Sequence, residues 1–355
     1  MISQVFARNP MDATMQLKPE PQISFSDIQE VLPEHNYHFL KPVGAGGFGS
    51  VFLVHSDKYN QEFCIKKIKQ REPVTDETKG EAITLLRLCH PNIISMYEFF
   101  FDEAHTNLYI VLEYCSGGSF QELLEREGPI RSPKLYSYCY QILKALLYCH
   151  EQNVAHRDIK PANIFLDNCG RPKLADFGLS KKVDKGETTK VCAGSRPYMA
   201  PEVISYQKSD PFLADIWSLG ITFYCLAFGK LPWIYHNNEE LEMAIKTGVV
   251  SFPSYADARF CRLIRSMTAI NPAKREPLTK LLSSPIFDNI QKYNYSTLCP
   301  LHKSTTENAS YRRSTSLLPS TVSQNLILPK RINNLTYIQK KPERKGIVRQ
   351  KTFGS

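Results

Sequence analysis

The sequence has no long apolar run, and its first residues, MISQVFARNP, do not place a basic segment before an apolar one. Nothing in the 355 residues approaches the ~18 consecutive apolar positions of a membrane-spanning helix. We therefore expect neither a membrane span nor a secretory leader. The ten cysteines are scattered, without the close pairs of a zinc knuckle or a disulfide-rich secreted domain. These absences favour the cytoplasm, with the nucleus as the alternative.

Acidic residues are nearly missing from the C-terminal part of the chain. From Asn289 to Ser355 there are twelve Lys and Arg, but only Glu307 and Glu343 are acidic. Because the whole chain carries a net charge of +9, the rest of it is close to neutral. This part also lacks the interleaved aromatic and basic residues that favour binding to single-stranded nucleic acid. We expect residues 288–355 to be a basic, mostly disordered tail and nucleic acid not to be a partner.

The ordered part of the sequence changes its periodicity once. Residues 1–36 predict an irregular extension, in which SFSDIQEVL could form one short helix with Ser26 and Gln29 as a capping box. Residues 37–114 hold short β-prone runs and one helical segment; these are YHFLKPVG, SVFLVHS, EFCIKKIK, LYIVLEY and the helical KGEAITLLRL. Residues 115–287 are dominated by apolar residues at three- and four-residue spacing, which predicts helices.

A glycine-rich stretch, VGAGGFGSVFLV, places Gly44, Gly46 and Gly49 at the spacing GxGxxG. The same spacing occurs in dinucleotide-binding folds, where the glycines lead from a strand into a helix. Here residues 50–54 are β-prone, which favours a hairpin with a returning strand. The backbone amides of such a hairpin can close over phosphate groups, because no side chains stand between them.

The strand-like segment FCIKKIK brings in a resemblance to eukaryotic protein kinases, which place a lysine on the strand after the glycine hairpin. Lys66 matches that lysine. The resemblance implies that Lys66 contacts the phosphates of ATP and pairs with Glu81 of the following helix. Cys64 would share a strand face with Lys66, but a shift of one residue would exchange Lys66 with Lys67. The sequence leaves the two registers open.

Residues 156–165, HRDIKPANIF, taken alone would most simply form a solvated charged surface. After the glycines and Lys66, they resemble the kinase catalytic loop, H-R-D-x-K-x-x-N. In that family Asp158 would accept the proton of the attacking hydroxyl, and Lys160 would reach the transferring phosphoryl group. Asn163 and Asp176 of the following ADFG would hold Mg²⁺, which prefers hard oxygen ligands.

Further matches extend the resemblance over residues 37–287. Met199 to Glu202 resemble the end of an activation segment, Asp215 an aspartate that braces the catalytic loop, and Arg275 the partner of Glu202. The resemblance implies an α+β, bilobal protein-kinase-like fold, with a small β-rich lobe over about 37–114 and a larger helical lobe over about 115–287. It also implies a set of ATP-contacting residues: Val43, Gly44, Gly46, Gly49, Val51, Cys64, Lys66, Phe165, and Glu113 and Cys115 of the interlobe hinge, through their backbones.

The activity that the resemblance implies is ATP- and Mg²⁺-dependent phosphorylation of serine and threonine in protein substrates. Lys160 and Ser195 resemble the serine/threonine branch, and FGKLPW with the residues after it resembles the calcium/calmodulin-type and NIMA-related groups. The alternatives are a pseudokinase-type scaffold and a small-molecule kinase of related fold. Kinases that select upstream arginine commonly carry glutamates where this chain has Ser119 and Ala162. We therefore expect no strong preference for upstream arginine.

Control by phosphorylation is suggested by Arg157, which precedes the catalytic aspartate and could pair with a phosphate in the activation segment. Thr188 and Thr189, in KGETTKVCAGS, are the candidate sites, and ordinary loop hydroxyls are the alternative. An upstream activating kinase would then be a partner.

Overall fold

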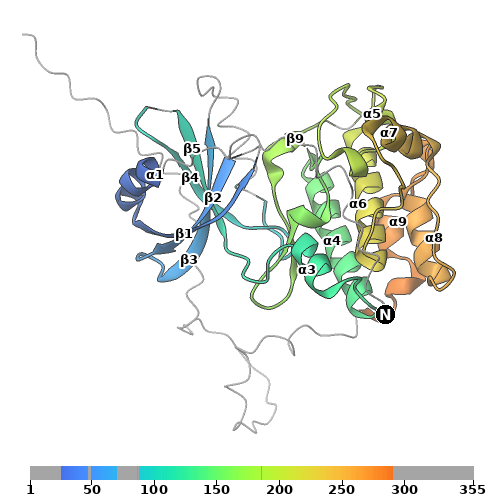
Figure 1. Ribbon diagram of the computed structural model, residues 1–355, viewed down its shortest axis with the longest axis horizontal. Helices are drawn as coiled ribbons and strands as arrows, with labels where there is room; N and C mark the ends of the chain where they lie inside the picture. The colour runs from blue at the N-terminus through green and yellow to red at the C-terminus, as the bar shows by residue number, and fades with distance from the viewer. Residues whose placement is uncertain are drawn as a thin grey trace, which may run out of the picture. The chain divides into compact units, whose positions relative to one another are not determined.

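The computed structural model describes residues 25–46, 49–69, 86, 88–104, 106–184 and 186–290, and the structural statements below concern these residues. The N-terminal half of the fold is a five-stranded antiparallel sheet with the order β1-β2-β3-β5-β4 (Figure 1). Its strands are β1 Tyr37–Gly46, β2 Gly49–Ser56, β3 Gln61–Lys69, β4 Met96–Phe101 and β5 Asn107–Glu113. The first three and the fifth of these strands are confirmed predictions, whereas β4 was not predicted.

The glycine-rich stretch forms the β1–β2 hairpin, with Gly46 opposite Gly49. The prediction that a strand, and not a helix, follows the glycines is therefore confirmed. Two register shifts, between Phe39 and Lys41 and between Pro42 and Gly44, interrupt the pairing of β1 with β2. Such bulges bend a strand and increase its local twist.

A short helix, α1 Phe25–Val31, precedes the sheet, followed by a 3-10 turn at Pro33–His35. The sequence allowed this helix, and Ser26 is its second residue. Ile28 and Leu32 are almost fully buried, in one apolar cluster with side chains of the strands. The packed structure thus begins before Tyr37, inside the region expected to be an irregular extension.

The C-terminal half is mostly helical (Figure 1). Its helices are α3 Phe120–Glu127, α4 Lys134–Glu151, α5 Pro201–Ile204, α6 Pro211–Phe228, α7 Asn238–Thr247, α8 Ala258–Met267 and α9 Leu278–Leu282. Two short ladders accompany them: β6 Val154–Ala155 pairs with β9 Lys181–Lys182, and β7 Ile164–Leu166 pairs with β8 Pro172–Leu174. A β-rich and a helical lobe together give the α+β bilobal fold that the sequence predicted.

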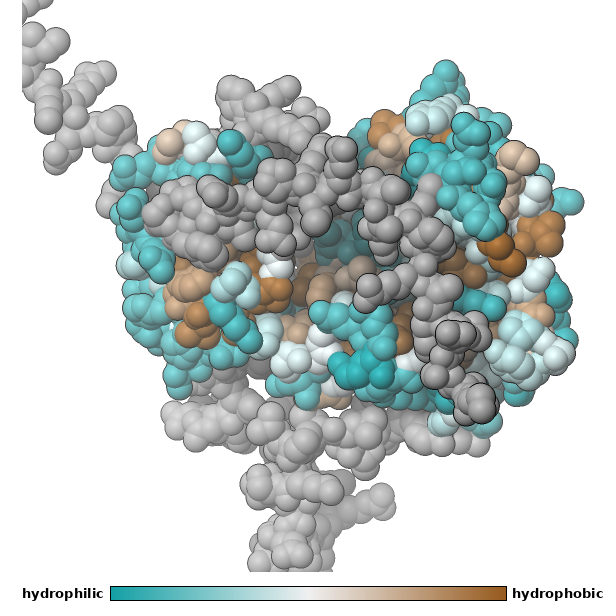
Figure 2. All heavy atoms as spheres, in the orientation of Figure 1, coloured by the Kyte–Doolittle hydropathy of each residue, from teal (hydrophilic) through white to brown (hydrophobic). Residues whose placement is uncertain are grey.

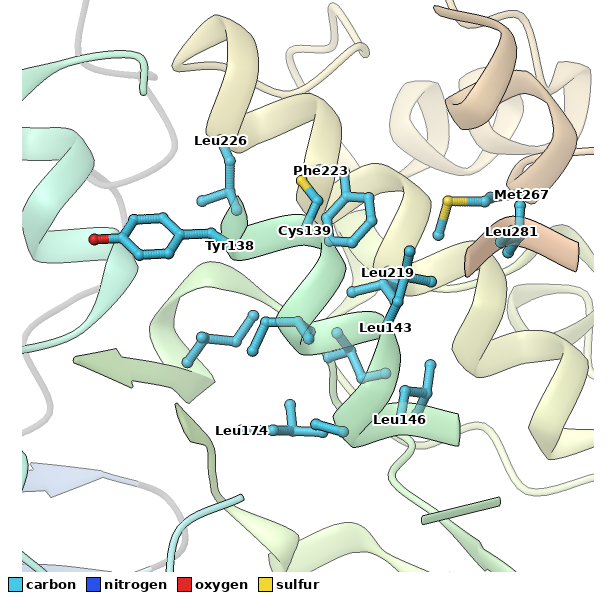
Figure 3. Close-up of a cluster of buried hydrophobic side chains, with 14 of the residues drawn as sticks. Tyr138, Cys139, Leu143, Leu146, Leu174, Leu219, Phe223, Leu226, Met267 and Leu281 are labelled. Atoms are coloured by element: carbon cyan, nitrogen blue, oxygen red, sulfur yellow. The ribbon is translucent and has the colours of Figure 1, made fainter. Parts of the chain in front are cut away.

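The core of the helical lobe lies between α4 and α6. Side chains of both helices meet there, together with Met267 of α8 and Leu281 of α9 (Figure 3). By length and composition, α6 is the one described helix that could cross a membrane, but 67% of it is buried inside the lobe. Truncating one of these buried side chains to alanine is expected to cost about 2–5 kcal/mol.

The surface is mixed in character. Figure 2 shows hydrophilic side chains over most of the coloured part of this face, with apolar side chains in several separate groups. Exposed apolar residues include Ile234, Tyr255, Met243 and Val249. The predicted helix at residues 79–88, apart from Leu86 and Leu88, and the tail beyond Ile290 lie outside the described residues.

Candidate active site

The centre of the site is the carboxylate of Asp158, in the loop between β6 and β7. Asp158 is 5% exposed and accepts three hydrogen bonds. Lys160 Nζ and Asn163 Nδ2 donate to its Oδ2 over 2.8 and 2.9 Å, and the backbone amide of Ser195 donates to its Oδ1 over 2.9 Å. The loop therefore gathers Lys160 and Asn163 of HRDIKPANIF around the carboxylate of Asp158.

These contacts set the protonation of Asp158. Burial, the largest single effect, would raise its pKa, but the hydrogen bond and charge of Lys160, with hydrogen bonds from Ser195 and Asn163, together outweigh it. The net result is a pKa below the ordinary value of 3.8. At neutral pH the carboxylate is ionised and can accept a hydrogen bond from an incoming hydroxyl group.

The loop that contains Asp158 is hydrogen-bonded to helix α6 through Asp215, which is 1% exposed. Its carboxylate accepts hydrogen bonds from the backbone amides of His156 and Arg157, each over 2.8 Å, and lies 3.0 Å from His150 Nε2. Arg157 has a positive φ of 68°, a conformation that costs energy in a non-glycine residue. Two backbone bonds to one buried carboxylate offset that cost and fix the loop in front of Asp158.

Strand β3 supplies Lys66. Antiparallel pairing places Lys66 opposite Val51 of β2 and Ile110 of β5, so these side chains share one face of the sheet. Lys66 Nζ reaches Asp176 Oδ1 over 2.6 Å, whereas Lys67 points to the other face, over the ring of Tyr109. The register is thus the one that directs Lys66 to the site. The expected partner Glu81 lies outside the described residues.

The glycine hairpin approaches β3 closely at one point. A Cβ added at Gly49, where φ is +128°, would meet the carbonyl oxygen of Lys67 at 2.0 Å, so only glycine fits there. A Cβ at Gly44 would meet no atom of the described residues within 4 Å. Packing therefore explains the glycine at position 49, while the described residues leave space for a ligand beside Gly44.

Other residues predicted to contact the nucleotide lie on the same elements. Val43 is half-exposed on β1, and Phe165 lies on β7, where it bridges to Ser119. Cys64 is opposite Leu112 of β5, on the face of Lys66. Burial, followed by the charge of Glu62, raises the pKa of the Cys64 thiol to about 11, so the group is neutral at pH 7.

The segment between the lobes contains an ion pair that the sequence analysis missed. Glu113 ends β5, and its carboxylate contacts Lys173 Nζ of β8 over 2.8 Å and accepts from the amide of Ser95. Lys173 is 5% exposed. The amide of Glu113 donates to the carbonyl of Ser95, and Cys115, two residues on, is buried. This ion pair therefore joins β5 of the five-stranded sheet to β8, the strand that precedes Asp176.

The segment after Asp176 contacts the catalytic loop at Gly194 and Ser195. A Cβ at Gly194, where φ is +112°, would meet the carbonyl oxygen of Arg157 at 2.5 Å. Ser195 Oγ accepts a hydrogen bond of 2.7 Å from Lys160 Nζ, so Lys160 bridges this hydroxyl and the carboxylate of Asp158. Ser195 is thus held in direct contact with the proposed catalytic pair.

The two threonines of this segment differ in accessibility. Thr188 is exposed, whereas Thr189 is half-buried and exchanges two backbone hydrogen bonds of 2.9 Å with Ser209. Thr189 and Arg157 line the same pocket beneath the segment. The segment ends at Glu202, whose carboxylate binds the guanidinium of Arg275 in a buried two-pronged ion pair.

The oxygen donors in the site suit a hard cation such as Mg²⁺. Asn163 directs its Nδ2 to Asp158, so its amide oxygen points away from that carboxylate, and Asp176 adds carboxylate oxygens. The described residues contain no group of three or more His, Cys, Asp or Glu placed to bind a metal. Two protein ligands completed by water and substrate phosphate oxygens are common for Mg²⁺.

Comparison with known proteins gives one family. A family profile described as "Protein kinase domain" matches residues 37–287. The chain is 35% identical over 244 residues to serine/threonine protein kinase OSK3 of Oryza sativa subsp. indica, covering 68% of this chain and 48% of that protein. It is 30% identical over 271 residues to sperm motility kinase 3A of Mus musculus, covering 76% and 53%. The chain thus spans about half the length of these relatives.

Proposed function

Because the chain belongs to the protein kinase family, with a matching domain over residues 37–287, we propose that it is a serine/threonine protein kinase that transfers the γ-phosphoryl group of ATP to protein hydroxyls. The observation that carries this proposal is the buried carboxylate of Asp158, held by Lys160, Asn163 and Ser195. The names of the relatives support the serine/threonine class. The resemblance to the calcium/calmodulin-type and NIMA-related groups stays a prediction.

In this mechanism Asp158 orients the attacking hydroxyl by accepting its hydrogen bond. Because the pKa of Asp158 is low, the carboxylate takes the proton only as the new O–P bond forms and the hydroxyl becomes strongly acidic. Lys160, 2.8 Å from this carboxylate, supplies positive charge beside the transferring phosphoryl group. The ADP oxygen leaves with the electron pair of the broken P–O bond.

The nucleotide would lie against the sheet face that carries Val51, Cys64 and Lys66. Lys66 would neutralise charge on its phosphates, and the open space beside Gly44 leaves room for them under the hairpin. Asn163 and Asp176 are the residues that would hold Mg²⁺. When bound, that ion neutralises phosphate charge and aligns the phosphoryl group for transfer.

The test uses the purified full chain with labelled ATP, Mg²⁺ and generic protein substrates, in parallel with Asp158→Asn. We expect wild-type protein to label serine and threonine, and Asp158→Asn to lower the rate by a factor on the order of 10² or more. Equal labelling by both proteins would attribute the signal to a contaminant. Binding of ATP without any transfer would favour the pseudokinase-type scaffold. Labelling of small molecules alone would favour a small-molecule kinase of related fold.

We further propose that an upstream kinase activates the protein by phosphorylating Thr188 or Thr189. The exposure of Thr188 and the shared pocket of Thr189 and Arg157 support the two sites. Thr189→Ala should lower the rate of substrate phosphorylation, and an unchanged rate would rule out Thr189 as the activating site. We also propose a cytoplasmic or nuclear location; the cysteines that the structure describes are free thiols, in agreement with a reducing compartment.

A further inference from the structure

Arg196 lies next to the catalytic carboxylate along the chain. It follows Ser195, whose amide is 2.9 Å from Asp158 Oδ1, and it begins the 3-10 turn Arg196–Tyr198. Consecutive Cα atoms are ~3.8 Å apart, and an extended peptide advances ~3.3 Å per residue. A peptide whose hydroxyl meets Asp158 therefore has its neighbouring residues within reach of the long side chain of Arg196.

The positive charge of Arg196 is only partly compensated. Among the described residues it forms an ion pair with Glu242 of α7, over 3.1 Å, and the side chain remains 40% exposed. Glu242 is shared, because its other oxygen binds Lys246 over 2.7 Å. The pKa of Glu242 lies below its usual range, chiefly because of the hydrogen bond from Lys246 and then its charge, with Arg196 contributing less. Two cations thus share one carboxylate.

One polar atom of Arg196 also lacks a partner. Among the described residues, the buried Nε has no hydrogen-bond acceptor, although a guanidinium offers five donors in a planar fork that matches a carboxylate or phosphate. Because Nε is shielded from solvent, an incoming anion would meet the exposed remainder of the side chain, and the Nε itself only shows that Glu242 does not satisfy the whole guanidinium.

The two positions where kinases that select basic substrates carry acids are Ser119 and Ala162 here, so neither position supplies a negative side chain of its own. Ser119 is the N-cap of α3, and the one carboxylate that contacts it, Glu122, accepts hydrogen bonds from the amide and hydroxyl of Ser119 in a capping box. Ala162 has no polar side chain. The substrate side of the site thus combines an incompletely neutralised arginine with the absence of these two acids.

We propose that Arg196 selects substrates that carry an anionic side chain, either a carboxylate or a phosphate, within about three residues of the accepting hydroxyl. This inference rests on the proposed function and names the substrate class that the site would take. Glu242 then limits the selectivity, because it competes with the substrate anion for the same guanidinium. Arg196 is a specificity-determining residue in this scheme and not a catalytic one.

The test measures the binding of fluorescent peptides to the full chain by anisotropy, which does not require turnover. Each peptide has one serine acceptor and, at one position from three before to three after it, a Glu, a phosphoserine, an Arg or a Gln. We expect wild-type protein to bind the Glu or phosphoserine peptide about three- to fivefold more tightly than the Gln peptide at one or more positions. Comparison of the Glu and phosphoserine series distinguishes a carboxylate from a phosphate ligand.

Three variants complete the experiment. Arg196→Gln should bring the ratio of anionic to Gln peptide affinity close to one, whereas Glu242→Gln should increase it. Arg259→Gln is the matched control, since Arg259 is an exposed arginine of α8 with one carboxylate partner, Asp257, and it should leave the ratio unchanged. Should Arg196→Gln prove unfolded by thermal melting, the increase in Glu242→Gln still tests the proposal.

The proposal is overturned if wild-type protein binds anionic and Gln peptides equally, or if Arg196→Gln keeps the same ratio as Arg259→Gln. Steady-state rates on the same peptides address the proposed function separately. Failure to phosphorylate any peptide would count against the kinase activity, while the binding ratios would still decide the role of Arg196.

Discussion

Replacement of Arg275 by methionine is expected to destabilise the folded domain by about 3–5 kcal/mol, because it leaves the buried carboxylate of Glu202 without a compensating positive charge. The side chain of Arg275 is fully buried, and its partner Glu202 is 7% exposed. The guanidinium makes two short bonds of 2.6 and 2.7 Å to Glu202, and it also donates to the carbonyl oxygens of Leu213 and Ala269. Methionine retains most of the length and apolar contact, so the loss is mainly electrostatic.

The magnitude can be measured as a shift of the melting temperature. For a domain of about 150–250 residues, 1 kcal/mol corresponds to about 2–4 °C, so Arg275→Met should melt about 6–20 °C lower than wild type. Arg259→Met, which breaks a solvent-exposed pair with Asp257, should lower the melting temperature far less than Arg275→Met does. Thermal melts of the three proteins at one scan rate and one salt concentration provide the comparison.

The double variant Glu202→Leu, Arg275→Met tests the cause. Removing both charges eliminates the stranded carboxylate, so the double variant should be more stable than Arg275→Met alone. Recovery should be incomplete, because the carbonyl groups of Leu213 and Ala269 lose their donor in both variants. The reasoning is refuted if Arg275→Met melts no lower than Arg259→Met, or if the double variant is less stable than the single one.

Three further predictions follow from other parts of the fold. Lys66→Met should weaken ATP binding about tenfold or more, whereas Lys67→Met, on the opposite face, should change it less than twofold; titration with a fluorescent ATP analogue measures both. A larger effect of Lys67→Met than of Lys66→Met would place the strand in the other register, and equal effects would contradict the assignment of Lys66 to the site. Ile28→Ala should cost about 2–5 kcal/mol in urea unfolding, since Ile28 is fully buried, and a loss below about 0.5 kcal/mol would show that α1 is not part of the cooperative unit. Burial, then the charges of Lys144 and Lys173, lower the pKa of His90 from 6.5 to about 4, so the stability that neutral His90 contributes is complete above pH 6.5 and is lost as the pH falls toward 4; urea midpoints should fall less steeply over that range in His90→Asn, and parallel curves would contradict this.

The sequence predicted the strands and helices whose side chains follow a clear period. The runs SVFLVHS and EFCIKKIK became β2 and β3 because β-branched and aromatic residues fit a half-buried sheet. Strand β4, with the sequence MYEFFF, was missed because it contains only aromatic residues, one methionine and one glutamate, without alternation. Its place at the sheet edge depends on pairing with β5, which no local pattern encodes.

In the site, residues within one motif were predictable, while contacts between distant segments were not. Asp158, Lys160 and Asn163 lie in ten consecutive residues, so chemistry and resemblance identified them together. The Glu113–Lys173 pair joins residues 60 positions apart, and neither belongs to a motif that demands the other. The choice between Lys66 and Lys67 required the observed register, since two adjacent lysines carry the same charge, point to opposite faces of the strand, and do not themselves indicate which face lies toward the site.

Helix α1 also affects how the chain folds during synthesis. Its buried Ile28 belongs to one apolar cluster with Tyr109 and Val111 of β5, which follow about 80 residues later in the chain. The ribosome synthesises about 5–20 residues per second, so these partners are added about 4–16 s after α1. Over that time its apolar face is available to chaperones, so α1 obtains its full packing partners only after β5 has been synthesised.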